Sequence, residues 1–277
     1  MALRTEAVTP AEWEQGALEA PKLERLAQSF LDDGVVIIEN VLSHSMLDHI
    51  AEMLDYSAAV YIGEDKGYER GAQGGFPREP ERPGLQICSG LPRQAPWITP
   101  ELASNPIIEQ CAQEFLRGEV FIRYFNCNTS CPGSGTQMIH ADQDWAWTTA
   151  AAAAEAGEAF PHRCTRIFVN FGVDAMTPEN GSTELWPGTH RLTEAAPWPP
   201  GWYHEADGWL PQSQRGTWLH DQWHEDAELC DTITATVDRQ RVARPPLQIR
   251  VPKGAVAIRD NRCWVSATTL CSASPKL

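Results

Sequence analysis

The hydrophobic pattern of the first sixty residues predicts helices around one buried strand. Thr9 is a capping hydroxyl before Pro10, and apolar side chains follow at helical spacing between Pro21 and Leu31. After an Asp-Gly break, Val35-Val36-Ile37-Ile38 is a β-branched run typical of a buried strand. Ser43 can then cap a further helix with the apolar face Met46, Leu47, Ile50 and Leu54. The part from about 1 to 60 is therefore predicted to be mainly helical.

The pattern changes to strand-like at Val120. Apolar and polar residues alternate, with turn residues between the runs, and this predicts strands at 120–125, 136–140, 166–173, 184–186, 247–251 and 254–260. The residues from 63 to 100 are rich in Gly, Pro and charge and predict a long loop around the mouth of a site. The residues from 193 to 248 form an insertion-like region with five of the eleven tryptophans. We expect a mainly β fold with helices on its outside.

Composition narrows the classes of partner. The chain has 277 residues, which suits one domain, and its net charge of −15 disfavours nucleic acid and anionic lipid. No run of about 18 apolar residues predicts a membrane span, and the eight cysteines lack a disulfide or Cys-x-x-Cys pattern. We expect a cytoplasmic protein with a small-molecule substrate and mostly reduced, buried cysteines; the oligomeric state is left open. Pro275-Lys276-Leu277 resembles a peroxisomal address only weakly.

The residues with the clearest chemistry are His140 and Asp142. A His-x-Asp pair at the end of a strand can present an imidazole nitrogen and a carboxylate oxygen to one cation. With a third ligand from a distant strand, such a pair forms a facial triad with three open positions. A solitary pair of this kind is more often a hydrogen-bonded pair than a metal site, so its context decides the interpretation.

That context is a series of motifs in a fixed order. His140 and Asp142 are followed by Asn180-Gly181-Ser182-Thr183 and by Pro187-Gly188-Thr189-His190, and Asp33-Gly34-Val35-Val36 precedes them. This series, over roughly 25–264, resembles the phytanoyl-CoA dioxygenase family of Fe(II)/2-oxoglutarate-dependent oxygenases.

The resemblance implies a double-stranded β-helix (jelly roll) at about 120–264 within a single domain of residues 1–277. It also implies Fe(II) bound by His140 and Asp142, with 2-oxoglutarate as co-substrate. Thr183 resembles the family's contact to the tail of 2-oxoglutarate, and Trp145 or Trp147 resembles the aromatic residue that walls it. The alternatives for these three residues are a turn hydroxyl and core aromatic side chains.

The third iron ligand is where the sequence departs from the family pattern. Gly254 to Trp264 follows the strand that precedes the family's last metal histidine, but Val265 stands at the position of that histidine. The tail 265–277 also lacks the arginine that the family uses for 2-oxoglutarate, and the closing strands of the sheet are expected to be incomplete. Either the natural protein has lost the site, or the tail comes from a changed reading frame or a retained intron. The abrupt change favours the second account.

Three other histidines are weaker candidates for metal binding. By the resemblance, His190 is a structural or supporting histidine, and as a turn residue it is expected to bond to backbone groups. His220 and His224 have the i, i+4 spacing of one helix face, but a solvated face is favoured over a separate metal pair.

Two hypotheses follow from these observations. The first is an Fe(II)/2-oxoglutarate-dependent oxygenase that hydroxylates a small, apolar metabolite, with the Trp-rich segment 193–224 lining its pocket. Its activity is in doubt because the third iron ligand is missing. The second is a non-catalytic jelly-roll pseudoenzyme or a truncated gene product.

Overall fold

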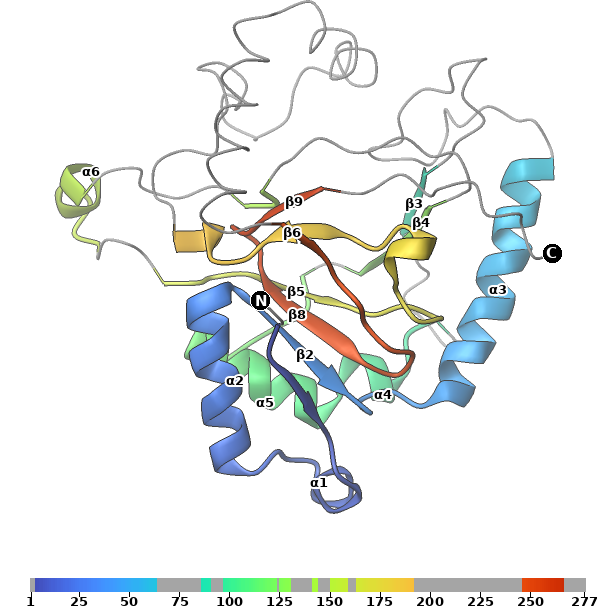
Figure 1. Ribbon diagram of the computed structural model, residues 1–277, viewed down its shortest axis with the longest axis horizontal. Coiled ribbons are helices and arrows are strands. Elements are labelled where there is room, and N and C mark those ends of the chain that lie inside the picture. Colours follow the sequence, from blue (N-terminus) through green and yellow to red (C-terminus); the bar gives the residue numbers. More distant parts are fainter. Residues whose placement is uncertain are drawn as a thin grey trace, which may run out of the picture.

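A computed structural model describes residues 3–63, 86–90, 97–123, 125–130, 141–143, 150–158, 163–191 and 246–266 (Figure 1). The α-helices in these ranges are α1 (Pro10–Gln15), α2 (Ala20–Asp33), α3 (His44–Gly63), α4 (Pro100–Ala103), α5 (Pro106–Leu116) and α6 (Ala150–Glu155). Two short 3₁₀ helices are η2 (Pro178–Asn180) and η3 (Thr189–Arg191). The strands are β1 (Thr5–Ala7), β2 (Val35–Glu39), β3 (Gln86–Gly90), β4 (Asn126–Ser130), β5 (Ile167–Asn170), β6 (Glu184–Trp186), β7 (Leu247–Gln248), β8 (Val256–Asp260) and β9 (Trp264–Ser266).

The strands form three sheets. The largest has the order β1-β2-β8-β5, in which β1 is parallel to β2 and the other pairs are antiparallel. The second joins β3 and β4, and the third has the order β7-β6-β9. Strands β2 and β8 are therefore paired on both sides, although they lie more than 200 residues apart in the chain. Long-range pairing of this kind fixes the centre of the fold.

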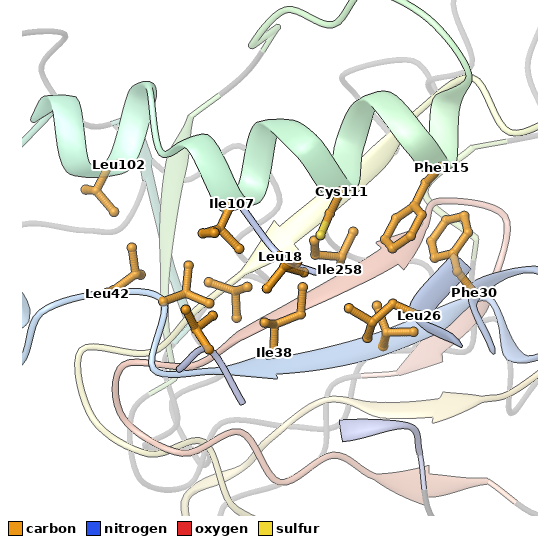
Figure 2. Close-up of a cluster of buried hydrophobic side chains, with 14 of the residues drawn as sticks. Leu18, Leu26, Phe30, Ile38, Leu42, Leu102, Ile107, Cys111, Phe115 and Ile258 are labelled. Atoms are coloured by element: carbon orange, nitrogen blue, oxygen red, sulfur yellow. The ribbon is translucent and has the colours of Figure 1, made fainter. Parts of the chain in front are cut away.

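Helices α2 and α5 cover one face of the large sheet (Figure 1). Their apolar side chains pack against alternate residues of β2 and β8, among them Ile38 and Ile258, as Figure 2 shows. The rings of Phe30 and Phe115 stack with their centroids 4.4 Å apart. Such a pair adds about 0.5–1.5 kcal/mol to the burial of its apolar area. The cluster closes the outer face of the sheet.

The opposite face of the same sheet forms a second core. The intervening residues of β2 and β8 pack there against the sheet of β6, β7 and β9. The buried members of this inner cluster are Val35, Ile37, Leu185, Ile249, Val251, Ala255, Ala257 and Val265. Because side chains alternate across a strand, the run from Val35 to Ile38 supplies both cores at once. This explains why the run is apolar at every position.

Local signals in the N-terminal part are confirmed. Thr9 and Glu12 form a capping box at α1, with the Thr9 N–H donating to the Glu12 carboxylate at 2.9 Å. Helix α2 ends at Gly34, whose φ of 76° lies in the left-handed region. Helix α3 begins directly after Ser43, as the sequence predicts, and the Ser43 hydroxyl donates to Glu101 at 2.9 Å.

Several sequence predictions are corrected by the structure. The strand expected at 120–125 is wrong for the described residues 120–123 and 125, which are irregular, and β4 begins only at Asn126. The physical reason is that Phe121 and Ile122 are adjacent and both exposed, Phe121 to 86%, so the apolar run has no buried face. The long loop expected at 63–100 contains β3, which pairs with β4. The strands expected at 166–173 and 247–251 are shorter, at 167–170 and 247–248, and α4, α5 and β1 were not predicted.

Some of the other predictions on strands and cysteines are confirmed, and the rest fall outside the described residues. The strands predicted at 184–186 and 254–260 are confirmed as β6 and β8, and Cys111, Cys164 and Cys263 are buried free thiols. The strand expected at 136–140, most of the insertion 193–248 and the tail after residue 266 lie outside the described residues. In the described part of the chain, every helix is too short or too polar to cross a membrane.

Candidate functional site

Strand β8 presents one charged side chain to the inner core. Val256 and Ile258 point to the helices, and Ala257 points to the inner cluster, so the alternation of the strand turns Arg259 inward as well. In the ladder, Arg259 lies between Val35 of β2 and Phe168 of β5. Its guanidinium carbon lies 5.1 Å from the centroid of the Phe168 ring, a cation–π distance. Neighbours on both sides thus confine this side chain.

The partner of Arg259 is Asp142, one of the two predicted metal ligands. Nη2 of Arg259 donates to Oδ2 of Asp142 at 2.6 Å, and the two side chains are 9% and 26% exposed. The next residue, Gln143, donates its backbone N–H to the carbonyl of Asn261 at 3.0 Å. Two contacts therefore bring residues 141–143 to the end of β8. A charge-assisted hydrogen bond of this length is strong for its kind.

Position 265, predicted by resemblance to be the third ligand position, lies on the inner side of β9. Val265 pairs with Leu185 of β6 and is only 3% exposed. Its side chain belongs to the inner apolar cluster, together with Val35 and Ala257. Valine has no donor atom for a metal, and here it serves as packing between the two sheets.

A second polar group lies at the turn between β8 and β9. Asp260 and Arg262 form a buried ion pair at 2.5 Å. Burial alone would raise the pKa of Asp260, but the hydrogen bond from Arg262 lowers it. Asp260 also accepts from the backbone N–H of Arg262 at 2.9 Å, which holds the turn together. The pair is a structural element of the turn that connects the two sheets.

His190 lies close to this turn. Its Nε2 contacts the carbonyl of Leu31 at 3.1 Å, which supports the interpretation of a turn histidine bonded to backbone groups. Its Nδ1 is buried and has no hydrogen-bond partner among the described residues. Burial lowers the pKa of His190 to about 4, and burial also raises the pKa of the neighbouring Cys263 thiol to about 12. Both groups are neutral at pH 7 and belong to the packing around Gly34.

Of the remaining predicted site residues, the structure describes only Thr183. Thr183 lies in the loop before β6, where its carbonyl accepts from the N–H of Ile249 at 3.0 Å. The residues His140, Trp145, Trp147, His220 and His224 lie outside the described residues. Within the described ranges, no group of three or more His, Cys, Asp or Glu side chains is arranged to hold a metal ion. Of the predicted ligands, the structure therefore places Asp142 alone.

Sequence reasoning missed Arg259. The signal was present, since a charged residue at an inward position of a strand that is buried on both faces needs a partner. Its partner lies 117 residues away in the chain, and the sequence does not reveal such a pairing.

The comparison with known families decides the affiliation of the chain. The family model described as phytanoyl-CoA dioxygenase (PhyH) matches residues 30–229, which is more than two thirds of the sequence. The chain belongs to the phytanoyl-CoA dioxygenase family. This confirms the resemblance drawn from the motif series. The family consists of Fe(II)/2-oxoglutarate-dependent oxygenases, so iron is its cofactor and 2-oxoglutarate its co-substrate.

Solved structures support the fold of a phytanoyl-CoA dioxygenase. The chain is similar to AviO1 from Streptomyces viridochromogenes Tue57, with a TM-score of 0.52, 19% identity, and coverage of 91% of this chain and 89% of that chain. It is also similar to SnoK, a non-haem α-ketoglutarate-dependent carbocyclase of nogalamycin biosynthesis, with a TM-score of 0.51, 14% identity, and coverage of 91% and 79%. These similarities confirm the jelly-roll fold in outline, with mixed sheets and outer helices.

In this phytanoyl-CoA dioxygenase, the side chain at position 142 is suited to bind the family's iron, and the side chain at position 265 is not. Asp142 offers a carboxylate, the kind of ligand that a facial triad contains. Val265, which the resemblance puts at the third ligand position, is an apolar side chain in an apolar cluster. A three-ligand site therefore does not fit the residues that the structure describes.

Proposed function

We propose that this chain is an Fe(II)/2-oxoglutarate-dependent oxygenase of one domain, residues 1–277, whose iron is held by His140 and Asp142 alone. The observation that carries the proposal is the position of Asp142 beside the inner face of β8, within a fold of the matching family. Its reaction is the hydroxylation of a small, apolar metabolite with dioxygen as the oxidant; the bound iron would let one oxygen atom enter the substrate and the other enter succinate as 2-oxoglutarate loses carbon dioxide.

The chain's own residues bind and orient the reactants. His140 and Asp142 anchor the iron, Thr183 contacts the tail of 2-oxoglutarate, and Trp145 or Trp147 forms a wall beside it. Tryptophans of the segment 193–224 line the substrate pocket, which suits an apolar substrate. The helical part at 1–60 covers the jelly roll at 120–264, and 265–277 is an atypical tail.

We expect the valine at position 265 to limit the turnover of 2-oxoglutarate, because it replaces an imidazole ligand of the iron. Losing an imidazole removes a coordination bond and also the geometry that orients the remaining positions around the ion. Val265 pairs with Leu185 and belongs to the inner apolar cluster, and valine has no donor atom for a metal. We expect weak iron binding and poor or no turnover of 2-oxoglutarate.

The buried position of Val265 also favours a second candidate function. In this alternative the chain is a non-catalytic jelly-roll protein that keeps the framework of its family without the metal. The two candidates differ in one observable, because only the first requires that a divalent ion bind at His140 and Asp142.

A titration with Mn²⁺, followed by electron paramagnetic resonance, separates them. The first candidate predicts weak binding by the wild-type protein that is lost in His140→Ala and in Asp142→Asn. The control is Asp174→Asn, which removes one negative charge from an exposed side chain. Succinate formation from 2-oxoglutarate with Fe(II) is measured alongside. Binding that is absent from the wild type, or unchanged in both ligand variants, supports the non-catalytic alternative and contradicts the first proposal.

A further inference from the structure

Arg259 is a buried cation whose ion pair with Asp142 bears on function. Its side chain is 9% exposed and lies on the inner face of β8, where the preceding inward residue, Ala257, is small and apolar. The carboxylate that it contacts, at 2.6 Å, is that of Asp142. We infer that Arg259 is the positioning residue of Asp142 and fixes the place of its carboxylate at the inner core. This inference rests on the proposed function in so far as Asp142 is a metal ligand.

The first support is the rigidity of Arg259 itself. Strand β8 is paired with β2 on one side and with β5 on the other, and Arg259 lies opposite Val35 and Phe168 in the register, so its backbone has little freedom. The Phe168 ring lies 5.1 Å from the guanidinium carbon and confines the end of the side chain. A group held by a central strand is a better support for a ligand than one held by a loop.

The second support is the local structure of residues 141–143, which form neither helix nor strand. The backbone of this segment is tied to the end of β8 by the 3.0 Å bond from Gln143 to Asn261. The side-chain amide of Gln143 donates to the hydroxyl of Thr165 at 2.9 Å. These contacts fix the chain path next to Asp142, and the ion pair with Arg259 then fixes the carboxylate. Ligating carboxylates are commonly held by hydrogen bonds of this kind.

The third support is the electrostatic balance of the inner core. The Arg259 side chain is only 9% exposed, so its buried charge needs a compensating one, and the carboxylate of Asp142, whose side chain is 26% exposed, supplies it. Among the described residues, Nη1 of Arg259 is buried and has no hydrogen-bond partner, whereas Nη2 donates to Asp142. The ion pair with Asp142 is therefore the contact that gives this buried charge its direction.

The test compares Arg259→Gln with the conservative Arg259→Lys. Arg250→Gln is the matched control, because Arg250 forms an ion pair of 2.8 Å with Glu179 on the surface. The first readout uses the metal-free protein and is the melting temperature of Arg259→Gln, Asp142→Asn and the double variant. The second readout is the dissociation constant for Mn²⁺, measured well below every melting temperature so that folding does not contribute.

Positioning predicts a specific result in each readout. Each single variant melts lower than the wild type, and the double variant melts no lower than the worse single variant, since the two side chains act together. Arg259→Gln raises the dissociation constant for Mn²⁺ by about 10–100-fold. Arg259→Lys keeps the dissociation constant within about threefold of the wild type, because the lysine retains a charged donor. Arg250→Gln changes neither quantity appreciably.

Two results overturn the inference, and a third separates it from the proposed function. Additive melting shifts in the double variant show that Arg259 does not hold Asp142. Unchanged or tighter Mn²⁺ binding in Arg259→Gln shows a purely structural ion pair. If the wild type itself binds no Mn²⁺, the proposed function fails, and the melting shifts of the metal-free variants then decide the role of Arg259 by themselves.

Discussion

Gly34 lies where three parts of the fold meet, and its replacement by alanine tests the packing around the site. Gly34 ends α2, and its carbonyl accepts from the N–H of Asp260 at 2.8 Å. A Cβ atom at this position would lie 2.5 Å from Nδ1 of His190 and closer still to Sγ of Cys263. Both neighbours are buried, so neither can move aside without disturbing the turn between β8 and β9.

Two terms contribute to the expected loss of stability in Gly34→Ala. The φ of 76° costs an alanine about 1–2 kcal/mol. Overpacking against two buried side chains adds about 1–3 kcal/mol. The sum is about 2–5 kcal/mol, which corresponds to a fall in melting temperature of about 4–20 °C for a domain of this size.

Gly157→Ala is the matched control for this prediction. Gly157 has nearly the same φ, 72°, but a Cβ atom there would meet nothing within 4 Å. Its replacement should cost only the backbone term of about 1–2 kcal/mol. Urea unfolding followed by tryptophan fluorescence measures both variants. Equal losses in Gly34→Ala and Gly157→Ala refute the close packing of Gly34 against His190 and Cys263.

Three further predictions concern the core and its titrating groups. Phe115→Ala should lose about 3–5 kcal/mol of unfolding free energy in urea, because it removes a buried ring stacked on Phe30, and a loss below about 1 kcal/mol contradicts the stacked core. Burial by itself raises the pKa of Glu12, but hydrogen bonds from Lys22 and from backbone N–H groups lower this pKa to about 2. The ionised carboxylate therefore adds to the free energy of unfolding above pH 4.5, and this contribution is lost as the pH falls toward 2, so Glu12→Gln should flatten the dependence of the unfolding free energy on pH in that window. Burial depresses the pKa of His190 to about 4, so the free energy of unfolding falls as the pH falls from 6.5 to 4. His190→Gln should remove that fall, and an unchanged slope of unfolding free energy against pH contradicts a neutral, buried imidazole.

The sequence predicted those parts of the fold that local signals encode. The β-branched run from Val35 to Ile38 identified β2, and Thr9 before Pro10 identified the start of α1, because strand burial and helix capping depend on neighbours in the chain. Helix α5 was missed although its signals are local: Asn105 caps it, Pro106 begins it, and apolar side chains recur at helical spacing. That segment could have been predicted from the sequence.

The candidate site depends on contacts that no local signal encodes. Asp142 was predicted as a ligand from a motif, but its ion pair with Arg259 arises only when β8 lies between β2 and β5. The burial of Val265 likewise depends on the pairing of β9 with β6 and on the facing sheet. The exposed Phe121 shows the opposite case, in which an apolar run was taken for a strand although tertiary packing leaves it outside.

The most direct test of the account concerns the place of Val265. The dissociation constant for Mn²⁺ is measured for the wild type, for Val265→His, and for Val265→Leu as a control that also enlarges the side chain. If Val265 occupies the position of a third ligand, Val265→His binds Mn²⁺ at least about tenfold more tightly than the wild type, and the gain disappears when Asp142→Asn is added. Val265→Leu gives no gain. Equal affinity in the wild type and Val265→His, or a gain that persists with Asp142→Asn, contradicts the account.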